Sequence, residues 1–225
     1  MKNLAKIFVA VVALFAYACA TDTTQDFAVK LEGQTTEITL SLEESRTQLG
    51  AEADGHYPLY WSEGDAISVN GTASAALSAA QAGSAAATFV VDGALATPYC
   101  IAYPAAPAGQ VLFAENQTHV GNTTFGSGVS TMYAYGDSNG VQLNHLTGVL
   151  KIGVVGSATI TKAQISTIDR APIAGAFAID FATGAVSATA DSKHVINYSF
   201  GEGVQLSSET TYLHVAVPAG VYDEL

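Results

Sequence analysis

The chain has 225 residues, with 8 Lys and Arg against 20 Asp and Glu, so its formal net charge is −12. Charged residues make up 12% of the chain and hydrophobic residues 49%, a balance that excludes a disordered polyelectrolyte. The acidic excess argues against nucleic acid as a partner, because sequence-independent binding needs clustered Lys and Arg. The two cysteines, Cys19 and Cys100, are too few for a disulfide-rich scaffold or a cysteine-based zinc cluster.

The first residues have the pattern of an export signal. Lys2 and Lys6 precede the apolar run 7–18, which is too short to cross a bilayer core of about 30 Å as a helix. A basic start, a short apolar stretch and small residues before a cleavage point are typical of a signal peptide. We therefore expect residues 1–18 to be removed. Their loss takes away both lysines and leaves six basic side chains against the 20 acidic ones, a balance of −14.

The residues around Cys19 predict how the exported chain is attached. Ala16-Tyr17-Ala18-Cys19 resembles a bacterial lipobox, although Ala16 stands where a large aliphatic residue is commonest and Tyr17 is bulky. The resemblance implies lipidation of Cys19 with two or three acyl chains, which are enough for stable anchoring. Residues 20–26 (ATDTTQD) would then form a polar tether. The alternative is ordinary cleavage, which leaves Cys19 as a free thiol or as a partner of Cys100.

From residue 27 onward, apolar residues alternate with polar ones in short runs, which is typical of half-buried β-strands. The strands predicted from this alternation are 27–31, 38–42, 67–69, 141–143, 177–181, 204–206 and 213–217. Two less polar runs, 99–103 and 149–155, are predicted as central strands buried on both faces. The Ala-rich segment 73–87 contains one large apolar residue, Leu77, and is predicted as a loop with at most one helical turn.

Turn-forming residues separate the predicted strands. Asn-Gly and Asp-Gly pairs tolerate positive φ and favour tight hairpins. The predicted turns are Gly64-Asp65, Asn70-Gly71, Asp92-Gly93, Asn139-Gly140, Thr183-Gly184 and Gly201-Glu202-Gly203. Many short strands at this spacing, with no convincing helical stripe, predict an all-β sandwich or open barrel.

The sequence shows no constellation of reactive residues. The five histidines are scattered singly, and His145 is predicted to be a hydrogen-bonded structural residue. Asp137-Ser138-Asn139-Gly140 lacks the later ligands of a calcium loop and is predicted as a plain turn. Trp61 is predicted to anchor the core rather than to stack on a sugar. We therefore predict no enzyme activity, no catalytic residue, no cofactor and no metal site.

Five segments in sequence carry a resemblance to a family. They are Trp61 to Val69 (WSEGDAISV), Tyr99 to Ala105 (YCIAYPA), Asn144 to Ile152 (NHLTGVLKI), Pro172 to Phe177 (PIAGAF) and Ala216 to Gly220 (AVPAG). In this order they resemble the fimbrillin-like proteins, which are exported lipoproteins and type V pilins of Bacteroidota. The resemblance spans about residues 27–225 and implies a transthyretin-like β-sandwich of antiparallel strands. Family members usually have two such domains, so we expect this chain to be the first part of a longer one.

The resemblance also implies an assembly mechanism. Type V pilins are cut by an arginine-specific protease and polymerise by strand exchange. Arg46, one of the two arginines of the chain, follows the predicted strand 38–42. A cut between Arg46 and Thr47 would release both the 27–31 and the 38–42 strands. The alternative is that Arg46 is a solvated loop charge in a chain that stays uncut.

These observations lead to one expected function and one alternative. The expected function is that of a lipid-anchored structural or accessory subunit of a fimbrium at the cell outer membrane, with other fimbrial subunits as partners. The alternative is a monomeric surface lipoprotein that binds a glycan, a host protein or another bacterial surface ligand through loops such as 104–131. That segment is rich in Gly, Asn and Thr and long enough to be functional.

Overall fold

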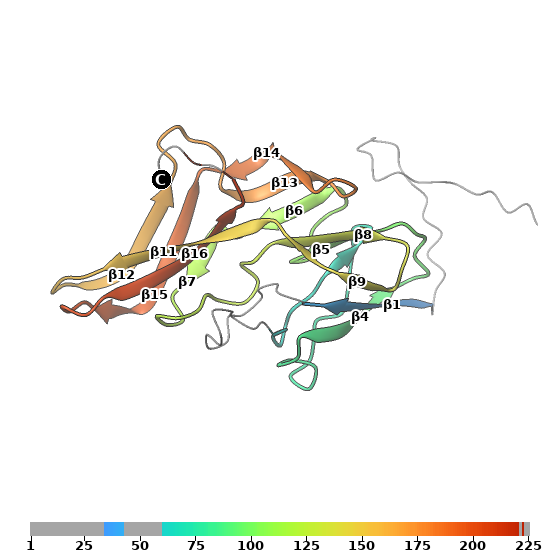
Figure 1. The fold of residues 1–225 in the computed structure, drawn as a ribbon, viewed down its shortest axis with the longest axis horizontal. Helices are drawn as coiled ribbons and strands as arrows, with labels where there is room; N and C mark the ends of the chain where they lie inside the picture. Colours follow the sequence, from blue (N-terminus) through green and yellow to red (C-terminus); the bar gives the residue numbers. More distant parts are fainter. Residues whose placement is uncertain (1–33, 43–59, 221, 223–225) are drawn as a thin grey trace, which may run out of the picture.

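The computed structural model describes residues 34–42, 60–220 and 222 (Figure 1). Every regular element in these residues is a β-strand, so the prediction of an all-β fold is confirmed. None of the described residues forms a helix that could span a membrane. The strands in chain order are β1 (Thr35–Ser41), β2 (Ser68–Val69), β3 (Thr72–Ala73), β4 (Ala86–Asp92), β5 (Tyr99–Tyr103), β6 (Gln110–Phe113), β7 (Asn116–Thr118), β8 (Met132–Gly136), β9 (Gly140–Gln142), β10 (Asn144–His145), β11 (Thr147–Val154), β12 (Thr159–Ser166), β13 (Ala174–Asp180), β14 (Ala185–Lys193), β15 (Val195–Gln205) and β16 (Thr211–Pro218).

The strands form five small sheets. The β1 sheet has the order β4-β1-β9, and the β5 sheet has the order β10-β8-β5-β2-β3. The β13 sheet (β14-β13-β6), the β15 sheet (β12-β15-β7) and the β16 pair (β11-β16) complete the fold. All pairings are antiparallel except β1 with β9 and β15 with β7. In Figure 1 the β1 and β5 sheets lie on the right, the β13 sheet above, and the β15 sheet and β16 pair on the left.

Strand β5 is buried on both faces, as predicted for 99–103. Its residues Tyr99, Ile101 and Tyr103 belong to a first core, which the β5 sheet shares with the β1 sheet. Cys100 and Ala102 point to the opposite side and belong to a second core, which the β5 sheet shares with the β13 sheet. The alternation of side chains along a strand allows this one strand to serve both cores.

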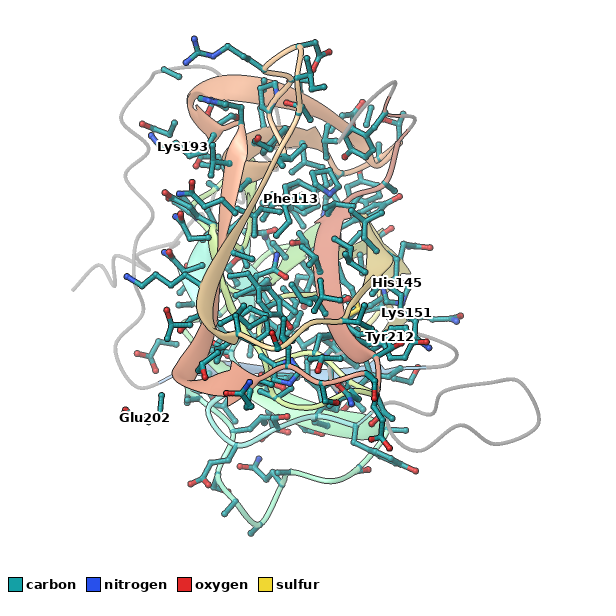
Figure 2. All side chains as sticks on the ribbon, turned by 90° about the vertical axis from the view of Figure 1, so that its left-hand side faces the viewer. Phe113, His145, Lys151, Lys193, Glu202 and Tyr212 are labelled. Atoms are coloured by element: carbon teal, nitrogen blue, oxygen red, sulfur yellow. The ribbon has the colours of Figure 1, made fainter. Side chains whose placement is uncertain are left out.

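The second core holds aromatic residues of the β13 sheet. Phe113 and Phe177 pack edge to face, with ring centroids 4.9 Å apart. Figure 2 shows Phe113 among the side chains enclosed by the sheets, whereas Lys193 and Glu202 lie on the outside. A third core joins the β15 sheet to the β16 pair.

The prediction of a second central strand at 149–155 is wrong. This segment is β11, which pairs only with β16 among the described strands and exposes Lys151, Ile152 and Gly153. The buried member of the pair is β16, which was predicted only as a half-buried strand. Lys151 and Gly153 interrupt the apolar run of β11, and a charged side chain is costly to bury without a partner.

The predicted turns are found with one difference. Asn70 and Gly71 both have positive φ and join β2 to β3 as a tight hairpin, as expected. By contrast, Gly201-Glu202-Gly203 lies inside β15, where the register with β12 shifts, and does not separate two strands.

The segment 73–87 contains no helix, as predicted, but 104–131 is not one long loop because β6 and β7 form within it.

The turn between β13 and β14 generates a first prediction. Gly184 has a φ of +74°, and a Cβ at this position would collide with the phenol ring of Tyr133. Gly83 has a similar φ of +79° but open space around it, so it provides a matched control. Gly184→Ala should lower the free energy of unfolding by about 1–3 kcal/mol more than Gly83→Ala does. Urea unfolding of both variants measures this difference, and equal losses would show that Tyr133 does not confine the turn.

Candidate functional site

The segment that the processing hypothesis would remove forms the middle strand of the β1 sheet. Strand β1 pairs with β4 along its whole length, from Thr35 opposite Asp92 to Ser41 opposite Ala86. On its other side, Thr39 to Ser41 run parallel to β9. The prediction of a strand at 38–42 is therefore confirmed. Because β1 has a neighbour on each side, its removal would leave an open edge on both β4 and β9.

One face of β1 is buried in the first core. Ile38 and Leu40 are fully buried and Leu42 is 4% exposed, whereas Thr35, Glu37 and Thr39 face solvent. Full burial of such an apolar side chain stabilises a fold by about 1.5–3 kcal/mol. Together the three inward residues contribute roughly 5–9 kcal/mol, against a typical domain stability of about 5–15 kcal/mol. The stability of the first core thus depends strongly on having a strand paired between β4 and β9, where β1 lies.

A polar residue fixes the register of β1, and the sequence pattern did not single it out. The Thr36 hydroxyl donates a hydrogen bond to the Gly93 carbonyl (2.7 Å) and accepts one from the Leu95 N–H (2.9 Å). The Gly93 N–H also donates to the Gln34 carbonyl (2.7 Å). A shift of β1 by one residue would break these bonds and turn the apolar side chains of β1 toward solvent.

The other residues of the hypothesis lie mostly outside the described residues. This applies to Cys19, to the predicted strand 27–31, and to Arg46 and Thr47, which follow the end of β1 in the sequence. The lipidation and cleavage predictions therefore stay predictions. Cys100 is described: its side chain is buried in β5.

Trp61 is a core anchor, as predicted. Its indole is 1% exposed and packs edge to face on Phe89 and Tyr103, with ring centroids 4.9 Å and 5.3 Å away. Phe89 belongs to β4 and Tyr103 to β5, so Trp61 connects the β1 sheet to the β5 sheet. Ile67 and Val69 lie in the same core, as the sequence predicted for this block.

Asp65, in the turn after Trp61, collects hydrogen bonds from three parts of the chain. Its Oδ1 accepts from the Tyr103 hydroxyl (2.8 Å) and from the Ser127 hydroxyl (2.7 Å), and its Oδ2 accepts from the Ser62 N–H (2.7 Å). The Gly128 N–H donates to the Tyr103 oxygen (3.1 Å). Asp65 thereby holds one end of the 119–131 segment against the first core. The sequence indicated a turn at Asp65 but not its partners.

Tyr103 is protected from ionisation. Burial raises its pKa far above the ordinary value, and the negative charge of Asp65 raises it further. A phenol in this position acts as a fixed hydrogen-bond donor, not as a proton carrier. The arrangement is therefore structural.

The described residues do not gather the side chains that metal binding would need. Among them, no group of three or more His, Cys, Asp and Glu side chains could hold a metal ion. His145 Nδ1 lies 3.4 Å from the Ser130 hydroxyl, which fits the structural role predicted for it. The best-formed candidate site is therefore the β1 position itself.

Comparison of the chain with known protein families, with curated proteins and with solved structures gives no match.

The burial of β1 generates a second prediction. Leu40→Ala should lower the free energy of unfolding by about 2–5 kcal/mol, because it leaves a cavity in the first core. Glu37 is an exposed residue of the same strand, and Glu37→Ala should change the free energy of unfolding by less than about 0.5 kcal/mol. Urea unfolding of both variants measures the difference. Similar values for the two would show that β1 contributes little to stability.

The Asp65 network generates a third prediction, which depends on pH. Because the folded state keeps the Tyr103 proton, this residue stabilises the fold below about pH 10 and loses that contribution as the pH rises further. Tyr103→Phe should lower the free energy of unfolding by about 1–3 kcal/mol at neutral pH. In the wild type the free energy of unfolding should fall as the pH rises from about 9 to 11, and in this variant the fall should be smaller. Tyr135→Phe, at an exposed position, should do neither. An unchanged alkaline decline in Tyr103→Phe would contradict the assignment.

Proposed function

We propose that this chain is an exported surface lipoprotein, anchored through Cys19 to the outer membrane, that serves as a structural or accessory subunit of a fimbrium. Assembly proceeds by β-strand exchange: cleavage after Arg46 releases β1, and a strand of a neighbouring subunit takes its place. The alternative of a monomeric surface lipoprotein that binds a ligand through its loops is an outcome of the test below.

The observation that carries the proposal is the position of β1. This strand is central in its sheet, its inward residues are fully or almost fully buried, and the next arginine, Arg46, lies five residues after its last residue, Ser41. Loss of β1 would expose the facing apolar residues Phe89 and Val91 of β4 together with two strand edges. A slot with these properties suits an incoming strand, since backbone hydrogen bonds provide affinity and alternate side-chain positions provide specificity.

The packing of the β1 sheet on the β5 sheet supports the finer part of the fold proposal, a transthyretin-like β-sandwich. Residues of both sheets, among them Ile38, Phe89, Ile101 and Met132, form one core. The β13 sheet adds a third layer on the far side of the β5 sheet. This extra layer distinguishes the arrangement from a sandwich of only two sheets.

A fourth prediction tests the processing step. Protein isolated from the native cell surface should begin at Thr47 in filaments, and the Arg46→Lys variant should keep β1 and lose or reduce the filaments. Arg170→Lys is the matched control, because Arg170 is the other arginine and lies exposed in the turn after β12. Amino-terminal sequencing and electron microscopy of cells give the readouts. Wild-type protein that begins only at Cys19, with filaments unaffected by deletion of the gene, would favour the monomeric alternative.

Mass spectrometry of the amino-terminal peptide tests the anchor separately. Acyl chains on the Cys19 sulfur are expected. Because a thioether-linked lipid and a disulfide to Cys100 exclude each other, a Cys19–Cys100 disulfide would contradict the lipoprotein assignment while leaving the strand-exchange test unaffected.

A further inference from the structure

Two histidines that are far apart in the sequence lie on segments that meet at the edge of β16. His119 follows β7, and its imidazole ring lies against Phe200 of β15, with ring centroids 5.2 Å apart. His214 lies in β16 and is 6% exposed. Tyr198 of β15 lies beside His119, with ring centroids 6.5 Å apart. We refer to His119, Tyr198 and His214 as the histidine cluster.

The polar atoms of the histidine cluster lack good partners. His119 Nδ1, His214 Nδ1 and the Tyr198 hydroxyl are three of the four buried side-chain polar atoms without a hydrogen bond among the described residues. Buried polar groups are nearly always hydrogen-bonded, so these unpartnered atoms call for an explanation. A neutral imidazole tolerates this surrounding better than an imidazolium does, because a buried charge costs far more than a buried dipole.

The charged group next to the histidine cluster is basic. Lys151 of β11 is the cross-strand neighbour of His214, and its ammonium lies over the Tyr212 ring at 4.4 Å from the centroid. Figure 2 shows Lys151 and Tyr212 next to each other. Burial lowers the pKa of His119 and of His214, and Lys151 and His119 lower that of His214 further. Among the described groups, no carboxylate opposes these effects on either ring.

The segment that carries His119 also holds the outer edge of β16. The Gln117 side chain donates to the Ala216 carbonyl (2.7 Å) and accepts from the Ala216 N–H (2.9 Å). The Asn122 side chain accepts from the Tyr212 N–H (3.0 Å). Side-chain amides thus occupy backbone groups that another strand would otherwise pair with. His214 lies between the two contacts on β16.

We propose that the histidine cluster is an acid-operated latch on this edge: protonation of His119 and His214 releases residues 117–122 from β16 and opens the β16 edge. Two imidazolium ions in this buried place repel each other and Lys151, and no described acid compensates them. At pH values above about 6.5, the ordinary pKa of histidine, both imidazoles are neutral and the cluster stabilises the closed edge. This contribution is lost as the pH falls below that value, because the open form binds the protons more readily.

Hydrogen exchange of single amides tests the latch in the intact protein. Between about pH 7.5 and pH 5, after correction for the intrinsic exchange rate, protection of the Tyr212 and Ala216 amides should fall at least about tenfold, which corresponds to about 1.4 kcal/mol in the free energy of local opening. The amides of Thr39 and Leu42, which are hydrogen-bonded at the β1 sheet, should keep their protection and serve as the internal reference. Equal loss at all four amides would indicate global unfolding and overturn the proposal.

Variants separate the latch from other effects of acid. His119→Phe with His214→Leu keeps apolar contacts in the cluster, and Tyr212 and Ala216 should then stay protected at pH 5. His194→Gln, at a half-buried histidine outside the cluster, should behave like the wild type. Should the double variant not fold, NMR titration of the wild-type imidazoles decides: the midpoints of His119 and His214 must coincide with the loss of amide protection. An unchanged acid response in the double variant, or midpoints that do not coincide, would overturn the proposal.

Discussion

Strand β5 is buried on both faces, and the first and second cores meet on it. Its residues Tyr99, Ile101 and Tyr103 support the first core, and Cys100 and Ala102 support the second. A strand buried on both faces must have layers on both sides, so the β1 and β13 sheets are held on a common support. Strand β1 therefore closes a core that is continuous with the body of the protein. This is why its occupancy matters for the whole fold.

Two strands with very different neighbours show how the fold deals with strand edges. Strand β1 has a strand on each side, so its backbone groups are paired through regular ladders. Strand β16 has β11 on one side only, and on the other side the amide side chains of Gln117 and Asn122 take the place of a strand. The first arrangement makes β1 costly to remove but leaves a well-shaped slot. The second covers an edge with contacts that a change of charge nearby can break.

The pattern of the sequence predicted β1 better than its neighbours, since β4 was not among the predicted strands. Alternation at Ile38, Leu40 and Leu42 predicted β1 and its buried face, and Asn70-Gly71 predicted a tight turn. The apolar run at 149–155 was misleading, because an edge strand and a central strand can share the same composition. Thr36 and Asp65 were not identified as structural centres, since their partners lie in distant segments that no local pattern links to them.

The amino-acid sequence by itself determined that the fold is built from strands, where most of the predicted turns fall and which residues of β1 face inward. These properties depend on the period of two and on the backbone preferences of Gly and Asn, which act over a few residues. Only the tertiary structure decided that β1 lies between β4 and β9, that Asp65 meets Tyr103 and Ser127, and that Gln117 meets Ala216. Such contacts depend on the path of the whole chain, because they join segments whose separation in the sequence carries no local signal.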